Sequence, residues 1–182
     1  MIIEEQSLED VLLFSPEIFE DERGYFFETY RDSIFKENNL NIKFVQDNEV
    51  FSKNKNVIRG LHYQLNNPQG KLVHVITGAI IDVIVDIRRG SPDFGKSIML
   101  NVNSSSHNMV YIPEGFAHGY LVLEKNTIIQ YKCTNYYDST SEFGIRWDDN
   151  DLNISWGIAN PIISDKDKNL PTLKEQCNLP VY

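Results

Sequence analysis

Two of the four histidines, His62 and His118, have neighbours suited to acid–base chemistry. His62 lies in VIRGLHYQ (57–64) and His118 in PEGFAHGY (113–120), each close to glycine and to charged or aromatic residues. Glycine permits a bulge in a strand and the close approach of a ligand to the backbone. Taken alone, either residue is better explained as a core histidine bonded to a backbone carbonyl, so a functional role needs support from other parts of the chain.

In a regular strand, the spacing of Arg59 and His62 would not let both side chains point into one pocket. Successive side chains of a strand point to opposite faces, so residues three apart lie on different faces. A β-bulge at Gly60, between them, would turn both side chains toward one pocket. We therefore expect an irregularity in this strand at Gly60.

The histidines give little support for a metal site. The chain has no HxH, HExxH or CxxC motif to bring two ligands onto one face, so a metal would need His62, His118 and a carboxylate from distant strands. His74, in KLVHVI, is expected to be a half-buried strand residue, and His107, in a Ser-rich turn, a surface residue. We predict no metal site.

The overall charge narrows the choice of ligand and compartment. The 182 residues carry a formal net charge of −9 and no long basic run, which argues against nucleic acid and requires a local cationic cluster for any anionic ligand. Cys133 and Cys177 lie far apart and are expected to be buried, reduced thiols. The N-terminal stretch is acidic, unlike a signal peptide, and no apolar stretch approaches the roughly 18 residues that a membrane helix needs. We expect a soluble, cytoplasmic protein.

Short strands separated by turn residues dominate the pattern. In the clearest strand, 81–88, one face carries Ile81, Val83, Val85 and Ile87, and the other carries Asp82, Asp86 and Arg88. Many such strands with frequent Asn, Gly, Pro and Ser turns predict an all-β sandwich, jelly roll or barrel in a single domain, 1–182.

Regular helix is scarce. One short helix is expected in YRDSIFKENN, capped by Asp32 or Ser33 and ending near Asn38 and Asn39. After about residue 157 the pattern loosens into a polar tail, SDKDKNLPTLKEQ, which is either a solvated excursion or a contributor to a site.

Several stretches together resemble the dTDP-4-dehydrorhamnose 3,5-epimerase family, over about Phe14 to Lys168. The resemblance rests on DERGYFFETY, FVQDN, RGLHYQ with the downstream QGK, PEGFAHG, YK-TNYY, SEFGIRWDD and ISDKD, in this order. It implies a cupin-type jelly roll, a homodimer, and cofactor-free epimerisation at C3 and C5 of a dTDP-linked 4-keto-6-deoxyhexose. The PxGxxH of residues 113–118 also resembles the second cupin motif, whereas the HxH of the first cupin motif is absent.

The resemblance also implies catalytic roles. His62 would be the base, since an imidazole with an unperturbed pKa of roughly 6.5 keeps a neutral fraction near pH 7. Asp167 would fix the tautomer of His62, Tyr131 would be the acid, and Lys71 would stabilise the enolate. Tyr137 is the rival acid should Tyr131 point away.

The remaining residues would bind the substrate. Arg23, Arg59 and Lys166 match the family's diphosphate contacts, and a guanidinium grips phosphate oxygens in a bidentate way. Base and sugar contacts would come from Phe26, against the thymine, and from Glu28, Gln46, Asn48, His118, Tyr137 and Glu142. In relatives the segment with Arg23, Phe26 and Glu28 can be lent by the partner subunit, which would make the site complete only in a dimer.

Two other functions remain open on the sequence. A single-site 3- or 5-epimerase or a ketoisomerase acting on a related nucleotide-linked ketosugar would share the fold and the phosphate cations. A non-catalytic carbohydrate-binding jelly roll would not need both the base and the acid, yet His62, Asp167 and Tyr131 are all present.

Overall fold

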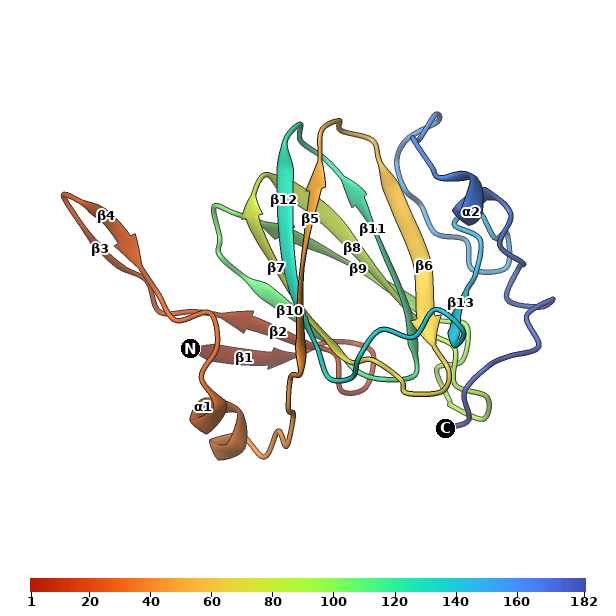
Figure 1. The fold of residues 1–182 in the computed structure, drawn as a ribbon, viewed down its shortest axis with the longest axis horizontal. Helices are drawn as coiled ribbons and strands as arrows, with labels where there is room; N and C mark the ends of the chain where they lie inside the picture. The colour runs from red at the N-terminus through yellow and green to blue at the C-terminus, as the bar shows by residue number, and fades with distance from the viewer.

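Two antiparallel β-sheets face each other in the computed structural model, which describes residues 1–182 (Figure 1). The six-stranded sheet has, in spatial order, β1 (Ile2–Glu5), β2 (Leu12–Ser15), β10 (Met109–Ile112), β7 (Lys71–Thr77), β12 (Thr127–Cys133) and β5 (Gln46–Ser52). The five-stranded sheet has β13 (Glu142–Gly144), β6 (Ile58–Gln64), β11 (Phe116–Val122), β8 (Ala79–Asp86) and β9 (Ser97–Asn103). The prediction of an all-β, double-sheet fold is confirmed.

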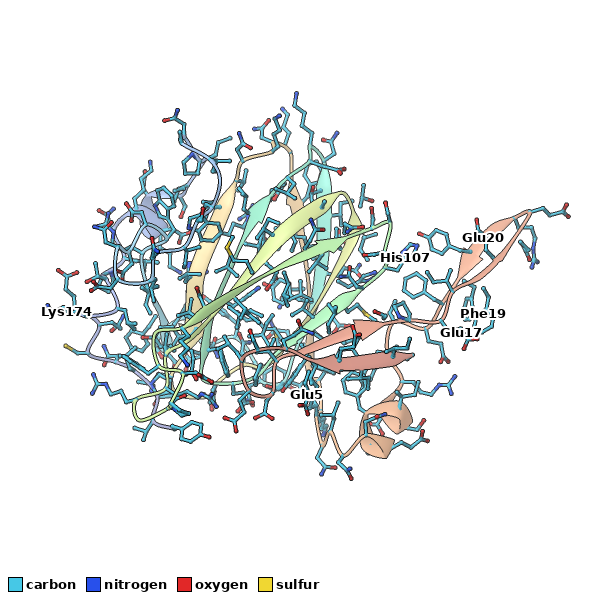
Figure 2. All side chains as sticks on the ribbon, turned by 180° about the vertical axis from the view of Figure 1, so that it is seen from behind. Glu5, Glu17, Phe19, Glu20, His107 and Lys174 are labelled. Atoms are coloured by element: carbon cyan, nitrogen blue, oxygen red, sulfur yellow. The ribbon has the colours of Figure 1, made fainter.

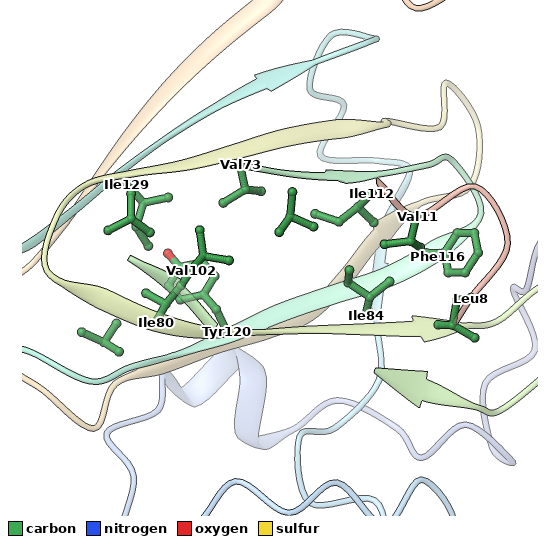
Figure 3. Close-up of a cluster of buried hydrophobic side chains, with 13 residues drawn as sticks. Leu8, Val11, Val73, Ile80, Ile84, Val102, Ile112, Phe116, Tyr120 and Ile129 are labelled. Atoms are coloured by element: carbon green, nitrogen blue, oxygen red, sulfur yellow. The ribbon is translucent and has the colours of Figure 1, made fainter. Parts of the chain in front are cut away.

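The core between the sheets explains the alternation in β8. Val83, Val85 and Ile87 pack on the outer side of the five-stranded sheet, in a cluster that includes Leu61 and Trp156. The even-numbered face of β8 points the other way, into a cluster that fills the space between the sheets (Figure 3). That cluster comprises Leu8, Val11, Val73, Val75, Ile80, Ile84, Val102, Val110, Ile112, Phe116, Tyr120, Val122 and Ile129. Both faces of this strand are therefore buried, and the acids on its even-numbered face lie inside the protein.

Two small elements lie outside the sheets. A hairpin of β3 (Phe19–Asp21) and β4 (Gly24–Phe26), here called the arm, projects away from the sheets (Figures 1 and 2). Helix α1 (Asp32–Glu37) follows, and its C-cap is Asn38, where the sequence predicted the helix to end. Its N-cap is Arg31, which makes no capping hydrogen bond through its side chain. The expected cap by Asp32 or Ser33 was wrong. Asp32 instead lies in the first turn, where its carboxylate pairs with Lys36 Nζ at 2.5 Å.

The polar C-terminal tail packs along the five-stranded sheet and is not a solvated excursion. A parallel bridge joins Ile162 to Val57, and the Ile58 amide donates to the Ile162 carbonyl at 3.0 Å. Helix α2 (Asp165–Lys168) follows, beside β6 (Figure 1). The tail therefore brings its polar residues to the strand that carries His62.

Other expectations have mixed outcomes. Neither cysteine is in a disulfide, as expected, but Cys177 is exposed, and only Cys133 is buried. His74 is half-buried on β7, as predicted. His107, which was predicted to be a surface residue, is also half-buried, because the rings of Tyr25 on the arm and Phe27 just after it pack against it. Neither of the two short helices could span a membrane.

Candidate active site

A cleft of about 590 Å³ lies between the two sheets, lined by residues from both. Seven residues that the sequence singled out line it: Arg59, His62, Lys71, His118, Tyr131, Lys166 and Asp167. A side pocket of about 230 Å³ shares His62, Lys71 and Tyr131 with the cleft and adds Gln46, Asn48, Tyr137 and Glu142. Residues from both sheets and the tail thus converge on one continuous site.

A β-bulge in β6 brings Arg59 and His62 into this cleft. His62 lies opposite His118 on β11, whereas Arg59 lies opposite Tyr120, so β6 has one residue more than β11 over this stretch. Gly60 has φ +112°, and a β-carbon there would lie 2.6 Å from the Gly119 Cα. A side chain cannot fit at that distance, and L-residues rarely adopt that φ. The predicted irregularity at Gly60 is confirmed.

His62 is hydrogen-bonded to a carboxylate of the tail. Its Nε2 lies 2.7 Å from Asp167 Oδ1, and the other carboxylate oxygen accepts from the Gly60 amide at 3.2 Å. Asp167 is 3% exposed, and its own amide donates to Ser164 Oγ at 3.1 Å. Burial raises the pKa of Asp167, but the hydrogen bonds, led by that from His62, outweigh it and hold the pKa below its usual value. An ionised Asp167 accepts a hydrogen bond from Nε2–H, so in the neutral tautomer that this bond selects the lone pair is on Nδ1.

A second histidine–aspartate pair lies beside the first. His118 Nε2 is 2.8 Å from Asp82 Oδ2, and Asp82 is 0% exposed. The remaining oxygen, Oδ1, has no hydrogen-bond partner. Because a buried carboxylate is stable only when it is paired, Asp82 fixes the orientation of His118 in the cleft.

The role of Asp82 was missed in the sequence, although a signal was present. Ile80 and Ile84 flank it on the same face of a strand, and an acid between two buried apolar residues indicates a buried carboxylate with a specific partner. Alternation separated the two faces of β8, but it did not show that the face with Asp82 points inward.

Lys71 and Tyr131 enter the cleft from the six-stranded sheet, on β7 and β12. Burial lowers the pKa of the Lys71 ammonium, while the nearby Asp82 and Glu142 carboxylates oppose this effect. Burial also raises the pKa of Tyr131, so its phenol is protonated at neutral pH. The site therefore has a proton donor and a cation on the sheet that faces His62.

Tyr137, the rival acid, has a different environment. Its side chain is exposed, and its hydroxyl donates to Glu142 Oε2 at 2.9 Å. The hydrogen bond to Glu142 is the main cause of its raised pKa. Lys166 Nζ donates to the same oxygen at 2.5 Å, so Glu142 joins Tyr137 to Lys166 beside the cleft. This geometry favours Tyr131 over Tyr137 as the acid.

The amides of the side pocket form a chain of hydrogen bonds. Gln46 Oε1 accepts from the Tyr137 amide at 2.9 Å, and Gln46 Nε2 donates to Asn48 Oδ1 at 3.0 Å. Asn48 Nδ2 in turn donates to the Cys133 thiol at 3.5 Å. These contacts hold both amides at the wall of the pocket.

Three predicted binding residues are not brought to this cleft. Arg23, Phe26 and Glu28 lie on the arm or just after it, where Arg23 pairs with Asp21 at 2.5 Å and Glu28 with Arg31. Figure 2, seen from behind, shows how far the arm extends from the sheets. These three residues could therefore bind the substrate only if the arm packs against a cleft.

No group of three or more His, Cys, Asp or Glu side chains is placed to hold a metal ion. The residues of the cleft are arranged as histidine–carboxylate pairs that face a phenol and an ammonium group. This arrangement suits proton transfer.

The family model for dTDP-4-dehydrorhamnose 3,5-epimerase matches residues 5–175. This chain belongs to the dTDP-4-dehydrorhamnose 3,5-epimerase family. It is 46% identical over 179 residues to the dTDP-4-dehydrorhamnose 3,5-epimerase of Methanothermobacter thermautotrophicus, covering 97% of this chain and 95% of that protein. The family resemblance of the sequence motifs is confirmed.

This chain also has the cupin-type fold of the epimerase family, as its similarity to two solved structures shows. A 3,5-epimerase from Legionella pneumophila in complex with dTDP-4-keto-L-rhamnose has a TM-score of 0.95 and 39% identity, covering 100% of this chain and 98% of that one. A 3'-monoepimerase from Streptomyces bikiniensis in complex with dTDP-quinovose has a TM-score of 0.91 and 30% identity, covering 97% of this chain and 92% of that one.

The His62–Asp167 hydrogen bond predicts a pH-dependent contribution to stability. Because the pKa of Asp167 is lowered in the folded protein, its ionised form stabilises the fold fully above about pH 4, the pKa of an unfolded aspartate. That contribution is lost as the pH falls further, through the lowered pKa of the folded state. We expect Asp167→Asn to reduce the free energy of unfolding by about 1–3 kcal/mol at pH 7, and by less below about pH 4, in urea titrations.

The matched control is Asp165→Asn on the same helix, where the carboxylate is 93% exposed and pairs only with Lys168. A surface change of this kind should alter stability by less than about 0.5 kcal/mol at both pH values. An equal loss of stability in Asp167→Asn at pH 7 and at low pH would contradict the assignment.

Proposed function

We propose that this chain catalyses epimerisation at C3 and C5 of a dTDP-linked 4-keto-6-deoxyhexose, in deoxysugar biosynthesis of the dTDP-L-rhamnose type. Membership of the 3,5-epimerase family supports this function. The observation that carries it is the placement of the His62–Asp167 pair and Tyr131 in one cleft, on opposing sheets.

The C4 ketone makes both inversions accessible to acid–base chemistry. C3 and C5 both adjoin the carbonyl, so removal of a proton from either carbon gives an enolate. The reaction then needs a base, a group that stabilises the enolate oxygen, and an acid on the opposite face of the ring. We expect the protein's own side chains to supply all three without a cofactor.

The two-sheet architecture supports inversion of configuration. His62 projects from the five-stranded sheet, whereas Tyr131 projects from the six-stranded sheet. A sugar ring held between them would have the base on one face and the acid on the other. His62 Nδ1 would remove the proton, and Tyr131 would return one from the opposite side. Lys71 and the Asp82-bound His118 would bind the enolate oxygen or the neighbouring hydroxyls.

The cations of the cleft are suited to the diphosphate. Arg59 lines the cleft without an ion-pair partner, and Lys166 lines it from α2 while bound to Glu142. A guanidinium can grip phosphate oxygens in a bidentate way, which favours Arg59 as the main contact. Gln46 and Asn48 would supply hydrogen bonds from the side pocket.

The arm supports a site shared between two subunits. Its aromatic residues Phe19, Tyr25 and Phe26 are all more than half exposed, an arrangement expected of an interaction surface. We propose a homodimer in which the arm of each subunit brings Arg23, Phe26 and Glu28 to the cleft of the other. A cytoplasmic location is also proposed, in keeping with the two unpaired cysteines.

The runner-up function is a single-site epimerase, favoured by the similarity to the 3'-monoepimerase of Streptomyces bikiniensis. Ketoisomerase activity on a related nucleotide-linked ketosugar is the other alternative. The same base and acid would serve one inversion or two, so counting the exchanged carbons distinguishes these functions.

His62→Asn removes the base but keeps an amide that can bond to Asp167. With dTDP-4-keto-6-deoxyglucose in D2O, we expect NMR to show deuterium uptake at C3 and C5 in the wild type. In the variant, uptake at both carbons should fall by about 10²–10⁴-fold, while affinity for unreactive dTDP-glucose changes little. Uptake at one carbon in the wild type would reject double epimerisation, and uptake at neither would reject the epimerase function.

Tyr131→Phe and Tyr137→Phe form a matched pair for the acid. Each removes one phenol hydroxyl, but only Tyr131 lines the cleft that also holds His62, Asp167 and His118. We expect Tyr131→Phe to slow product formation by about 10²-fold or more and to leave exchange faster than inversion. Tyr137→Phe should retain activity within about tenfold. The reverse order in NMR assays of both variants would assign the acid to Tyr137.

The shared site can be tested by complementation. One inactive chain carries His62→Asn, and the other carries Arg23→Ala with Phe26→Ala. If arms are exchanged, a mixed dimer has one intact site, so co-expressed chains should recover up to about one quarter of wild-type activity. No recovery, with mixed dimers verified by distinct affinity tags, would show that each arm serves its own cleft.

A further inference from the structure

The Tyr120 side chain is almost fully buried, yet its hydroxyl has no hydrogen-bond partner in the chain. Tyr120 is 6% exposed and packs between the sheets with Ile80 and Ile129 (Figure 3). Buried tyrosine hydroxyls usually find a partner, because leaving one unpaired is unfavourable. The missing partner is therefore a feature that needs a physical reason.

The hydroxyl differs from the enclosed polar atoms of the core. The fully enclosed atoms without a partner are Ser52 Oγ, His74 Nε2 and Asp82 Oδ1, and the Tyr120 hydroxyl is not among them. Tyr120 instead lines the large cleft. Its ring belongs to the core, and its hydroxyl reaches the space where the substrate would bind.

Its neighbours indicate which part of a substrate it would meet. Tyr120 is the cross-strand partner of Arg59 on β6 and of Asp82 on β8. Cross-strand partners project from the same face of a sheet, so Tyr120 and Arg59 approach the cleft side by side. An anion held by Arg59 would lie within reach of a donor in this position.

The chemistry of this phenol suits it to donate a hydrogen bond. Burial raises its pKa far above the usual value for tyrosine, although the positive charge of Arg59 opposes the effect. Such a phenol stays protonated and does not act as a base. Tyr120 also belongs to the same sheet as His62, so it cannot deliver a proton to the ring face opposite the base.

We propose that the Tyr120 hydroxyl donates a hydrogen bond to the phosphate that carries the sugar, beside Arg59. This inference rests on the proposed function and adds to it a specific binding residue. The hydroxyl completes its own hydrogen bonding when the nucleotide sugar binds, and it helps to fix the junction between sugar and phosphate relative to His62. A phosphate oxygen is a strong acceptor, because hydrogen bonds to charged groups are stronger than those to neutral ones.

Tyr120→Phe tests the proposal, because it removes the hydroxyl and keeps the ring in the core. Loss of one hydrogen bond to a charged acceptor corresponds to about a ten- to hundredfold weaker Kd. We expect isothermal titration calorimetry to show this loss of affinity for both dTDP and dTDP-glucose. Affinity for dTMP, which lacks the second phosphate, should stay within about twofold. In turnover assays KM should rise, with kcat within about threefold of wild type because His62 and Tyr131 remain.

Tyr111→Phe is the matched control. Tyr111 is 8% exposed, and it packs with Phe14 and Leu72 on the outer side of the six-stranded sheet, outside the cleft. This variant should bind all three nucleotides as the wild type does. Thermal unfolding of both variants would verify that each is folded.

The outcomes separate this inference from the proposed function. If the wild type binds dTDP-glucose and Tyr120→Phe binds it equally well, the hydroxyl has no part in binding and the inference fails alone. A loss confined to dTDP-glucose would place the contact on the hexose and overturn the phosphate assignment. If the wild type binds neither dTDP nor dTDP-glucose, the proposed function fails as well.

Discussion

The close backbone contact between Gly60 and Gly119 is the constraint on which the site depends. A β-carbon at Gly119 would lie 2.7 Å from the Arg59 carbonyl, and one at Gly60 would clash with Gly119, so neither strand tolerates a side chain here. The extra residue of β6 turns Arg59 and His62 into one cleft. The Gly60 amide then donates to Asp167. One irregularity thus positions a cation, a histidine and the carboxylate bound to that histidine.

The two histidine–aspartate pairs are held in different ways. Asp82 lies on a central strand with core on both faces, so its position is fixed by the packing of the sheets. Asp167 lies on a helix of four residues, which is too short to be stable alone. It is held by Ser164, Gly60 and His62. The carboxylate bound to His62 therefore depends on local hydrogen bonds, whereas the carboxylate bound to His118 depends on the core.

The sequence predictions were accurate where the signal lies within one short segment, and they failed where distant segments pack together. Period-two alternation and turn residues were sufficient for the β fold. The bulge was predicted from Gly60 and from the assumption that Arg59 and His62, at an odd spacing, serve one pocket. The predicted N-cap of α1 was wrong because this helix is held mainly by packing: Phe35 stacks on Phe14 at a distance of 4.9 Å between ring centroids. Asp82 and Tyr120 were not predicted as site residues. Their strands are buried on both faces, so no pattern within them shows which face meets the cleft.

The arrangement of the site follows from its place between two sheets. A single sheet presents its side chains to one side of a ligand, whereas two facing sheets can contact both faces of a sugar ring. Here the histidines come from one sheet, and Lys71 and Tyr131 come from the other. The hydrophobic cluster between the sheets fixes their separation, because a packed core resists compression. The core that stabilises the fold therefore also sets the distance across which a proton would be removed on one face of a sugar and returned on the other.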